Sequence, residues 1–289
     1  MPDTIEELRR DLAIANRLVA NEGILDAFGH ISMRNPTNPK RYFLSRSLAP
    51  AQIQADDIQE YDLDSQPIIS SPLRPYMERV IHGEIYKARP DVNAVCHHHA
   101  PGIMPFAISG VPVLPVFHLG ASMGRIAPFW DSRDEFGDTN LLVAKPEEGA
   151  SLARALGSHT MVVMRRHGAT VVGRNLKELI FATIYSTRNA EYQLAAHSLG
   201  HVSPLSAGEI DMAEEIHRAP GPLARAYDVW AQRLSEREGR ASAASTVATT
   251  SARRTAAATK TKPTAAKKAK SAKKTSNKAK PAKKKSRGK

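Results

Sequence analysis

The sequence predicts a single α/β domain, a β-sheet with helices on its faces, followed by a basic tail. Segments with the alternation of strands are interspersed with segments that have the helical spacing of apolar residues, without a regular βαβ period. The sequence contains neither G-x-G-x-x-G nor a P-loop, which argues against a nucleotide-binding doubly wound fold. Hydrophobic residues make up 42% of the 289 residues, enough for a substantial core.

The first expected element is a helix near the N-terminus. Thr4 and Glu7 fit a capping box, and apolar residues then follow at three- and four-residue steps to about Gly23. Runs of β-branched and aromatic residues bounded by turn residues predict the strands, which span residues 30–34, 41–45, 58–63, 91–100, 112–117, 161–164 and 171–172. Apolar stripes predict the remaining helices, which span residues 76–88, 147–156, 207–217 and 222–236, with a long helix capped by Asn175 before the last two.

Residues 241–289 differ in composition from the rest of the chain. They contain 16 of the 41 basic residues and none of the 29 acidic ones, which leaves residues 1–240 with 25 basic residues and a net charge of −4. Large apolar side chains are nearly absent, so we expect this Lys/Ala-rich segment to be a disordered tail beside one domain over residues 1–240. The tail is suited to non-specific binding of nucleic acid phosphates, to other polyanions, or to keeping the protein soluble. It has no aromatic residue, so base stacking is not expected.

Composition also bears on the compartment. A single cysteine excludes an internal disulfide framework. No apolar run approaches the roughly 18 residues of a membrane span, and the acidic, amphipathic N-terminus lacks the apolar region of a signal peptide. We therefore expect a cytoplasmic protein that does not interact with membranes.

The segment DVNAVCHHHA, residues 91–100, carries the clearest chemical signal. Side chains alternate between the two faces of a strand, so His97 and His99 point to one face and His98 to the other. Two imidazoles on one face of a rigid strand are half of a transition-metal site. Two candidates for a third ligand stand out: His167, in a tight turn after an apolar strand, and His30, in Phe28-Gly29-His30-Ile31.

Four ordered motifs at matching spacing resemble the class II aldolase/adducin family over roughly residues 5–235. They are Glu78-x-x-x-His82, Tyr86, the run ARPDVNAVCHHHAPG and the run RRHGATVVG. The resemblance implies a three-layer α/β/α fold with a mostly antiparallel sheet, and a homotetramer with active sites between subunits.

The resemblance also implies a site. His97, His99 and His167 match the family's metal ligands, and the metal is Zn²⁺ or Mn²⁺, with Co²⁺ as a further possibility. Glu78 matches the catalytic acid/base. His118 stands where aldolases of the family supply a tyrosine from a neighbouring subunit, and could deliver or take a proton.

The sequence departs from the phosphosugar aldolases of the family in its phosphate-binding loops. Their Gly-Asn, Thr-Pro-Ser-Gly and Ser-Ser-Glu elements correspond here to Gly29-His30, residues 45–49 and Tyr76-Met77-Glu78. Small residues that would cradle a phosphate are therefore missing, and arginines occur nearby, whose planar guanidinium groups suit carboxylates. The substrate-binding residues expected from these loops are Gly29, His30, Ser45, Arg46, Ser47 and Arg74.

The pattern SRSLAP followed by RPYxERxIHGEIY is similar to the family's decarboxylases of hydroxylated aromatic or pyridine carboxylates. It predicts a metal-dependent carbon–carbon lyase in which loss of CO2 from a small carboxylate leaves a metal-stabilised enolate, protonated by Glu78 or His118. An aldolase acting on a small sugar-like substrate shares that intermediate and stays open. So does a non-catalytic binding module like adducin, although such a module would not need metal ligands.

Overall fold

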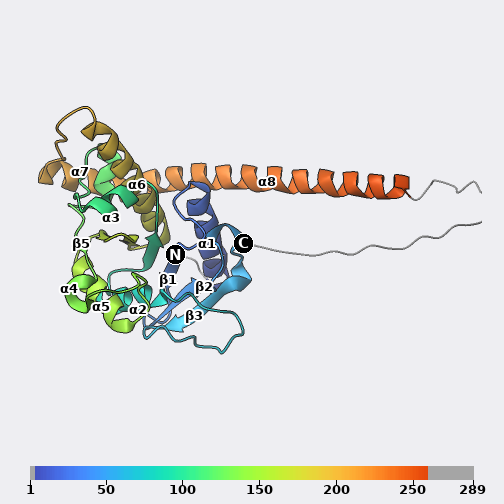
Figure 1. Cartoon of the computed structure of the whole chain (residues 1–289), viewed down its shortest axis with the longest axis horizontal. Helices are drawn as coiled ribbons and strands as arrows, with labels where there is room; N and C mark the ends of the chain where they lie inside the picture. Colours follow the sequence, from blue (N-terminus) through green and yellow to red (C-terminus); the bar gives the residue numbers. More distant parts are fainter. Residues whose placement is uncertain (1–3, 260–289) are drawn as a thin grey trace, which may run out of the picture. The chain divides into compact units, whose positions relative to one another are not determined.

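A seven-stranded sheet forms the centre of the fold (Figure 1). The computed structural model describes residues 4–259, and for residues 242–259 it describes only the backbone. The strands share one sheet in the order β3-β2-β1-β4-β7-β6-β5; they are β1 (His30–Arg34), β2 (Arg41–Ser45), β3 (Ile58–Asp62), β4 (Ala94–His98), β5 (Phe129–Trp130), β6 (Met161–Met164) and β7 (Gly168–Gly173). The histidine strand β4 therefore lies at the centre of the sheet, between β1 and β7.

The sheet is mixed, which departs from the expected mostly antiparallel arrangement at one pair of strands. β5 pairs with β6 in parallel, whereas the other neighbouring strands are antiparallel. The chain between β5 and β6 contains the helix α5 (Pro146–Leu156), and a helical crossover of this kind returns the chain in the same direction.

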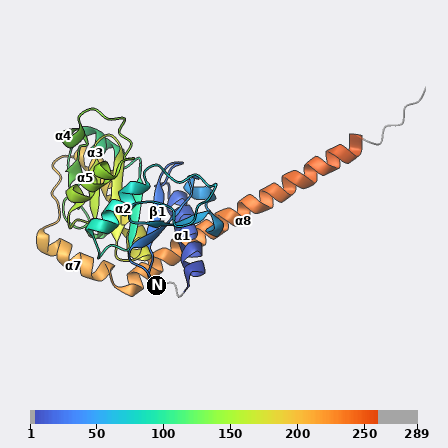
Figure 2. The ribbon, with the colours of Figure 1, turned by 90° about the horizontal axis from the view of Figure 1, so that it is seen from below.

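Helices cover both faces of the sheet, as the sequence predicts. On one face, side chains from α1 (Ile5–Asn21), α3 (Met104–Ser109) and α6 (Leu176–His197) form a buried cluster with alternate strand residues. On the other face, α2 (Arg79–Ala88) and α5 form a second cluster with the opposite strand residues (Figure 2). The remaining elements are η3 (His118–Met123), α4 (Arg133–Phe136), α7 (Ala207–His217), α8 (Pro220–Thr259) and two short 3-10 helices, η1 (Pro50–Gln52) and η2 (Ala55–Asp57).

The two helix caps predicted from the sequence, at Thr4 and Asn175, are confirmed. Thr4 caps α1 in a reciprocal box with Glu7, and the Asn175 side chain accepts a hydrogen bond from the backbone N–H of Glu178 at the start of α6. Both caps satisfy backbone donors that a helix leaves unpaired at its first turn.

The strand predicted over residues 112–117 is wrong. Its two prolines have no N–H to give to a neighbouring strand. The polar atoms of its backbone pair instead with side chains of α6: Asn189 bonds Leu114 and Val116, and Gln193 bonds Pro112 and Leu114. The two-residue strand β5 is too short to show an alternation in sequence, and it was not predicted.

The chain divides into two units, Met1–Gly239 and Arg240–Lys289. Disorder is predicted from residue 241 onward, whereas the described part of that segment has helical backbone as far as Thr259. Residues 241–259 are rich in alanine, the best helix former, so their backbone is helical without needing an apolar core. The rest of the predicted tail, residues 260–289, lies outside the described residues. Within residues 4–259, no helix is long and apolar enough to cross a membrane.

A buried arginine fixes the approach to the histidine strand. The guanidinium of Arg34, at the end of β1, donates hydrogen bonds to the carbonyls of Tyr86 and Arg89 at the end of α2, of Val92 just before β4, and of Pro39. Four carbonyls bound by one planar cation hold the α2–β4 connection against β1. The register of β4, and with it the direction of its histidines, is set partly by this contact.

Candidate functional site

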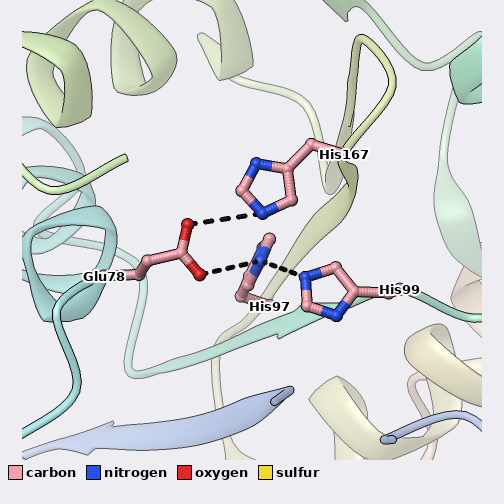
Figure 3. A group of neighbouring side chains, drawn as sticks. All are labelled: Glu78, His97, His99 and His167. Atoms are coloured by element: carbon pink, nitrogen blue, oxygen red, sulfur yellow. Dashed lines mark hydrogen bonds and ion pairs between the residues drawn. The ribbon is translucent and has the colours of Figure 1, made fainter. Parts of the chain in front are cut away.

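Four side chains from three separate segments converge at the C-terminal end of β4 (Figure 3). They are Glu78, His97, His99 and His167, and one possible ligand atom of each lies within 4.8 Å of those of the others. The three histidines predicted as metal ligands and the glutamate predicted as acid/base are therefore brought together by the fold.

His97, on β4, and His99, which directly follows the strand, share a face, as strand alternation predicts. The Nε2 atoms of His97 and His99 lie 3.1 Å apart. His98 points to the other face, where its Nδ1 accepts a hydrogen bond from the backbone N–H of Ala100. Cys96 shares that face, and burial raises the pKa of its thiol to about 12, so it acts as a small core side chain.

His167 comes from the turn between β6 and β7. Arg166 adopts a positive φ of 54° in this turn, and Gly168 then begins β7 beside β4. A Cβ atom at Gly168 would lie 2.2 Å from the carbonyl oxygen of His98, so only glycine lets β7 approach this closely. Because the turn is held against β4, the His167 ring stacks on that of His99 with centroids 5.2 Å apart.

Glu78 lies just before the first turn of α2 and is 7% exposed. Its Oε1 is 3.3 Å from Nε2 of His167, and its Oε2 is 3.7 Å from Nε2 of His97. Burial raises the pKa of this carboxyl group to about 7, although the backbone N–H of Val143, which donates to Oε1, opposes the shift. A group with this pKa exchanges a proton near neutral pH, as general acid/base catalysis requires.

The outer nitrogens of His97 and His99 each have a hydrogen-bond partner. Nδ1 of His99 lies 3.2 Å from Oδ2 of Asp26, and Nδ1 of His97 lies 3.2 Å from Oγ1 of Thr170. Asp26 accepts a hydrogen bond from His99, and Thr170 can accept one from His97 because its own hydroxyl donates to Met164 Sδ. Both Nε2 atoms are then left with lone pairs that face each other.

This donor set fits a divalent metal. Three imidazole nitrogens are ligands that Zn²⁺ and Mn²⁺ accept, and histidine ligands typically donate their other N–H to an oxygen, as His99 does to Asp26. Burial lowers the pKa of His97 well below its usual value and that of His167 to about 4, which keeps both rings neutral and able to coordinate.

Asp26 and Thr170 were missed by the sequence reasoning. The Asp26 side chain also accepts hydrogen bonds from the backbone N–H groups of Phe28 and Gly29, at 2.8 and 3.0 Å. The segment Asp26-Ala27-Phe28-Gly29 has the composition of such a turn, so this signal was present in the sequence. Nothing in the sequence linked the turn to His99, which lies 73 residues further on.

The predicted substrate residues Gly29 and His30 lie beside the four-residue group. His30 pairs with His97 across β1 and β4, with ring centroids 5.3 Å apart, and is fully buried. A Cβ at Gly29 would lie 2.5 Å from the Leu25 side chain and 3.1 Å from the carbonyl oxygen of His97. Glycine at this position therefore allows the loop to pass directly over the histidine strand.

The remaining predicted substrate residues differ in how free they are. Ser45 is buried at the end of β2, and Arg46 is held by Asp57, whose Oδ1 lies 2.6 Å from its Nε. Ser47 and Arg74 are exposed, and their segments are joined because the backbone N–H of Ser47 donates to the carbonyl of Arg74. Arg46 is therefore already paired within the chain, whereas Arg74 presents its side chain to solvent.

His118 lies elsewhere within the same chain. It is exposed at the start of η3, and its ring meets that of His217 on α7 with centroids 4.5 Å apart. Among the described residues, the group that could hold a metal does not include it.

The chain is similar in sequence to several known proteins. The model of the class II aldolase and adducin N-terminal domain matches residues 10–194. The chain is 34% identical over 189 residues to the decarboxylase tropJ of Talaromyces stipitatus, covering 61% of this chain and 71% of that protein. It is 27% identical over 217 residues to a 3,4-dihydroxyphthalate decarboxylase of Arthrobacter keyseri, covering 69% and 82%.

A solved structure shows the same fold. An L-fuculose 1-phosphate aldolase from Glaciozyma antarctica PI12 superposes with a TM-score of 0.68 at 21% identity, covering 83% of this chain and 94% of that one. Together with the match over residues 10–194, these findings establish that the chain belongs to the class II aldolase and adducin family.

Proposed function

We propose that this protein is a metal-dependent decarboxylase of a hydroxylated aromatic or heteroaromatic carboxylate. The observation that carries the proposal is the convergence of three histidines with a carboxyl group whose pKa is about 7. Two of the relatives described above are named decarboxylases, one of them of a dihydroxyphthalate, which supports this substrate class.

His97, His99 and His167 would hold the metal, with Zn²⁺ or Mn²⁺ as the expected ion and Co²⁺ as a substitute. A bound divalent ion acts as a Lewis acid, which stabilises negative charge on a substrate oxygen as the carbon–carbon bond breaks. Asp26 and Thr170 would keep the His99 and His97 rings in the coordinating orientation through their Nδ1 atoms.

Glu78 is the proposed proton donor. When CO2 leaves, the carbon that carried it needs a proton, and a carboxyl group with a pKa of about 7 is partly protonated at neutral pH. The backbone N–H of Val143 binds Oε1 and holds the group in place. We infer that Glu78 transfers its proton to that carbon and is protonated again from solvent.

The proposed substrate contacts come from two segments. Gly29, His30, Ser45, Arg46 and Ser47 lie at or beside β1 and β2, and Arg74, which precedes Glu78, is joined to this side by the hydrogen bond from the backbone N–H of Ser47. Arg74 is the candidate for pairing with a carboxylate, since Arg46 is occupied by Asp57. Tyr76 and Met77 stand where phosphate-binding relatives carry serines, which favours a planar carboxylate over a phosphosugar.

His118 is proposed to act on a neighbouring subunit. Within its own chain it faces His217, so a catalytic role requires an oligomer that brings it to a second copy of the metal group. We propose a homotetramer of this kind, which mass measurement in solution would test.

The aldolase alternative uses the same residues, because cleavage of an aldol also leaves a carbanion for Glu78 to protonate. The experiment that separates the two is turnover of a panel of hydroxyaryl carboxylates and sugar-like aldol substrates with Zn²⁺, Mn²⁺ or Co²⁺, monitoring CO2 and aldehyde. Release of CO2 supports the proposal. Release of aldehyde alone would replace it with the aldolase, and absence of both products and of bound metal would favour an adducin-like binding module.

Two further proposals rest on the sequence. Residues 241–289 carry a net charge of +16 from 16 Lys and Arg, which supports non-specific binding to nucleic acid or another polyanion. A cytoplasmic location stays a prediction, and cell fractionation would test it.

A further inference from the structure

Four buried polar side chains form a continuous hydrogen-bonded chain that leads to His30. The Oη of Tyr86 lies 2.8 Å from the Oγ of Ser32, which lies 2.6 Å from Nδ1 of His82. The Nε2 of His82 lies 2.7 Å from Nδ1 of His30. All four residues are at most 1% exposed, so water does not compete for these bonds.

The hydrogen bonds of this chain can run in either direction, and Tyr86 is the first donor in the forward one. Among the described residues, Ser32 is the one hydrogen-bond partner of the Tyr86 hydroxyl, so in the forward direction that hydroxyl donates to Ser32. The Ser32 hydroxyl then donates to Nδ1 of His82. Burial lowers the pKa of His82 to about 3, so this ring is neutral and carries its single proton on Nε2, which donates to His30.

This direction determines the tautomer of His30. Its Nδ1 accepts the bond from His82, so the proton of the neutral ring is on Nε2. Each direction leaves one buried donor unpaired: the Tyr86 hydroxyl in the reverse direction and Nε2–H of His30 in the forward one. The two donors differ in position, because Tyr86 packs within a core cluster whereas the His30 ring contacts that of His97, where a bound substrate can supply an acceptor. The forward direction is therefore the one that a ligand can complete. The one donor left over is Nε2–H of His30, which is buried and has no partner among the described residues.

The unpaired Nε2–H of His30 lies next to the metal-binding histidines and needs an acceptor that the described residues do not provide. We propose that Tyr86, Ser32 and His82 fix the tautomer of His30 so that its Nε2–H donates a hydrogen bond to an oxygen of the bound carboxylate substrate. The acceptor, and with it the choice of direction, rests on the proposed function, whereas measurement of the tautomer needs no substrate. Nε2 of His30 is shielded from solvent, and the centroid of the Tyr76 ring lies 4.5 Å from that of the His30 ring. We therefore expect the Tyr76 ring to shift when substrate binds.

The tautomer can be measured without any substrate. Nitrogen NMR of the full chain labelled with 15N-histidine distinguishes a protonated from an unprotonated ring nitrogen, and loss of a signal in His30→Gln and in His82→Gln assigns the two rings. We expect both His30 and His82 to carry their proton on Nε2. A proton on Nδ1 of His30 in the wild-type protein would overturn the inference.

Two substitutions at position 82 test the positioning role. In His82→Gln, the side-chain carbonyl can accept from Ser32 and the amide can donate to His30, so the direction is kept. His82→Met has a similar size but cannot donate. We expect His82→Met to lower kcat/KM by about 10- to 100-fold, the value of a hydrogen bond to a charged acceptor, mainly through KM, and His82→Gln to restore it to within about threefold of wild type.

Tyr42→Phe is the matched control. It removes a buried tyrosine hydroxyl that bonds Ser65 in the same core. This hydroxyl makes no hydrogen bond with Tyr86, Ser32, His82 or His30, so turnover and the His30 signal should not change. If His82→Met turns over like His82→Gln, the proposed role of His30 is wrong. If the wild-type protein decarboxylates no substrate, the proposed function fails, while the NMR result still decides the tautomer.

Discussion

Nδ1 of His99 lies 3.2 Å from Oδ2 of Asp26, so the turn before β1 supplies the partner of the histidine that directly follows β4. The same carboxylate receives the backbone N–H groups of Phe28 and Gly29. One side chain therefore links the orientation of a proposed metal ligand to the loop that carries Gly29 and His30. Loss of the Asp26 carboxylate should disturb both.

We expect Asp26→Ala to weaken metal binding by about 10- to 100-fold, the usual effect of removing the outer partner of a histidine ligand. The dissociation constant for Zn²⁺, measured by competition with a chelator, checks this. Asp64→Asn, which changes a carboxylate that pairs with Lys87 instead, should leave the constant unchanged. Equal affinities for Asp26→Ala and wild type would show that Asp26 does not support the site.

Glu78→Gln should keep the metal and lose turnover by about 10²- to 10⁴-fold, because an amide fills the same space but cannot transfer a proton. Metal content by elemental analysis and initial rates with the best substrate of the panel measure the two effects. Glu84→Gln, on the helix that follows Glu78 and paired with Lys87, is the control and should remain active. Full turnover by Glu78→Gln would remove Glu78 from the mechanism.

Stability should fall as the pH is lowered below about 6.5, because His82 is buried as the neutral ring. Its pKa is about 3 in the folded protein and near the ordinary 6.5 in the unfolded chain, so between these values the unfolded state binds more protons. Each such histidine contributes a slope of up to about 1.4 kcal/mol per pH unit in the free energy of unfolding, and none above pH 6.5.

Urea unfolding at a series of pH values measures that slope. His82→Gln cannot titrate, so its free energy of unfolding should depend on pH less steeply than that of wild type by about this amount. Identical slopes below pH 6.5 would mean that His82 is protonated in the folded state.

Arg74→Ala should raise the KM for a carboxylate substrate by about tenfold with little change in the melting temperature, since the side chain is exposed and is proposed to bind the substrate anion. Steady-state kinetics test this, with Arg133→Ala as a control that removes an arginine paired with Asp131. An unchanged KM would assign the carboxylate to another residue.

Removal of residues 241–289 should leave turnover and metal content unchanged, because the residues of the site lie between Asp26 and Thr170. Binding to duplex DNA should weaken, and the salt dependence of binding should decrease, since 16 cationic side chains are lost. Titration at several salt concentrations measures both, and a loss of turnover on truncation would contradict this separation of tail from site.

Local patterns in the sequence were sufficient for much of the fold. The capping box at Thr4, the cap at Asn175 and the alternation of His97, His98 and His99 each depend on residues a few positions apart. Short-range geometry of this kind is repeated in all helices and strands, so it can be read before the chain folds. The resemblance to a known family then connected His167 and Glu78 to His97 and His99.

Contacts between distant segments could not be read in this way. The bond from His99 to Asp26, the pairing of residues 112–117 with Asn189 and Gln193, and the parallel β5–β6 pair all join segments whose proximity depends on the whole topology. The raised pKa of Glu78 likewise comes from burial, which no sequence pattern around it indicates. Residue spacing thus identified the reactive groups, whereas their partners, tautomers and protonation depend on packing that forms only when the sheet is assembled.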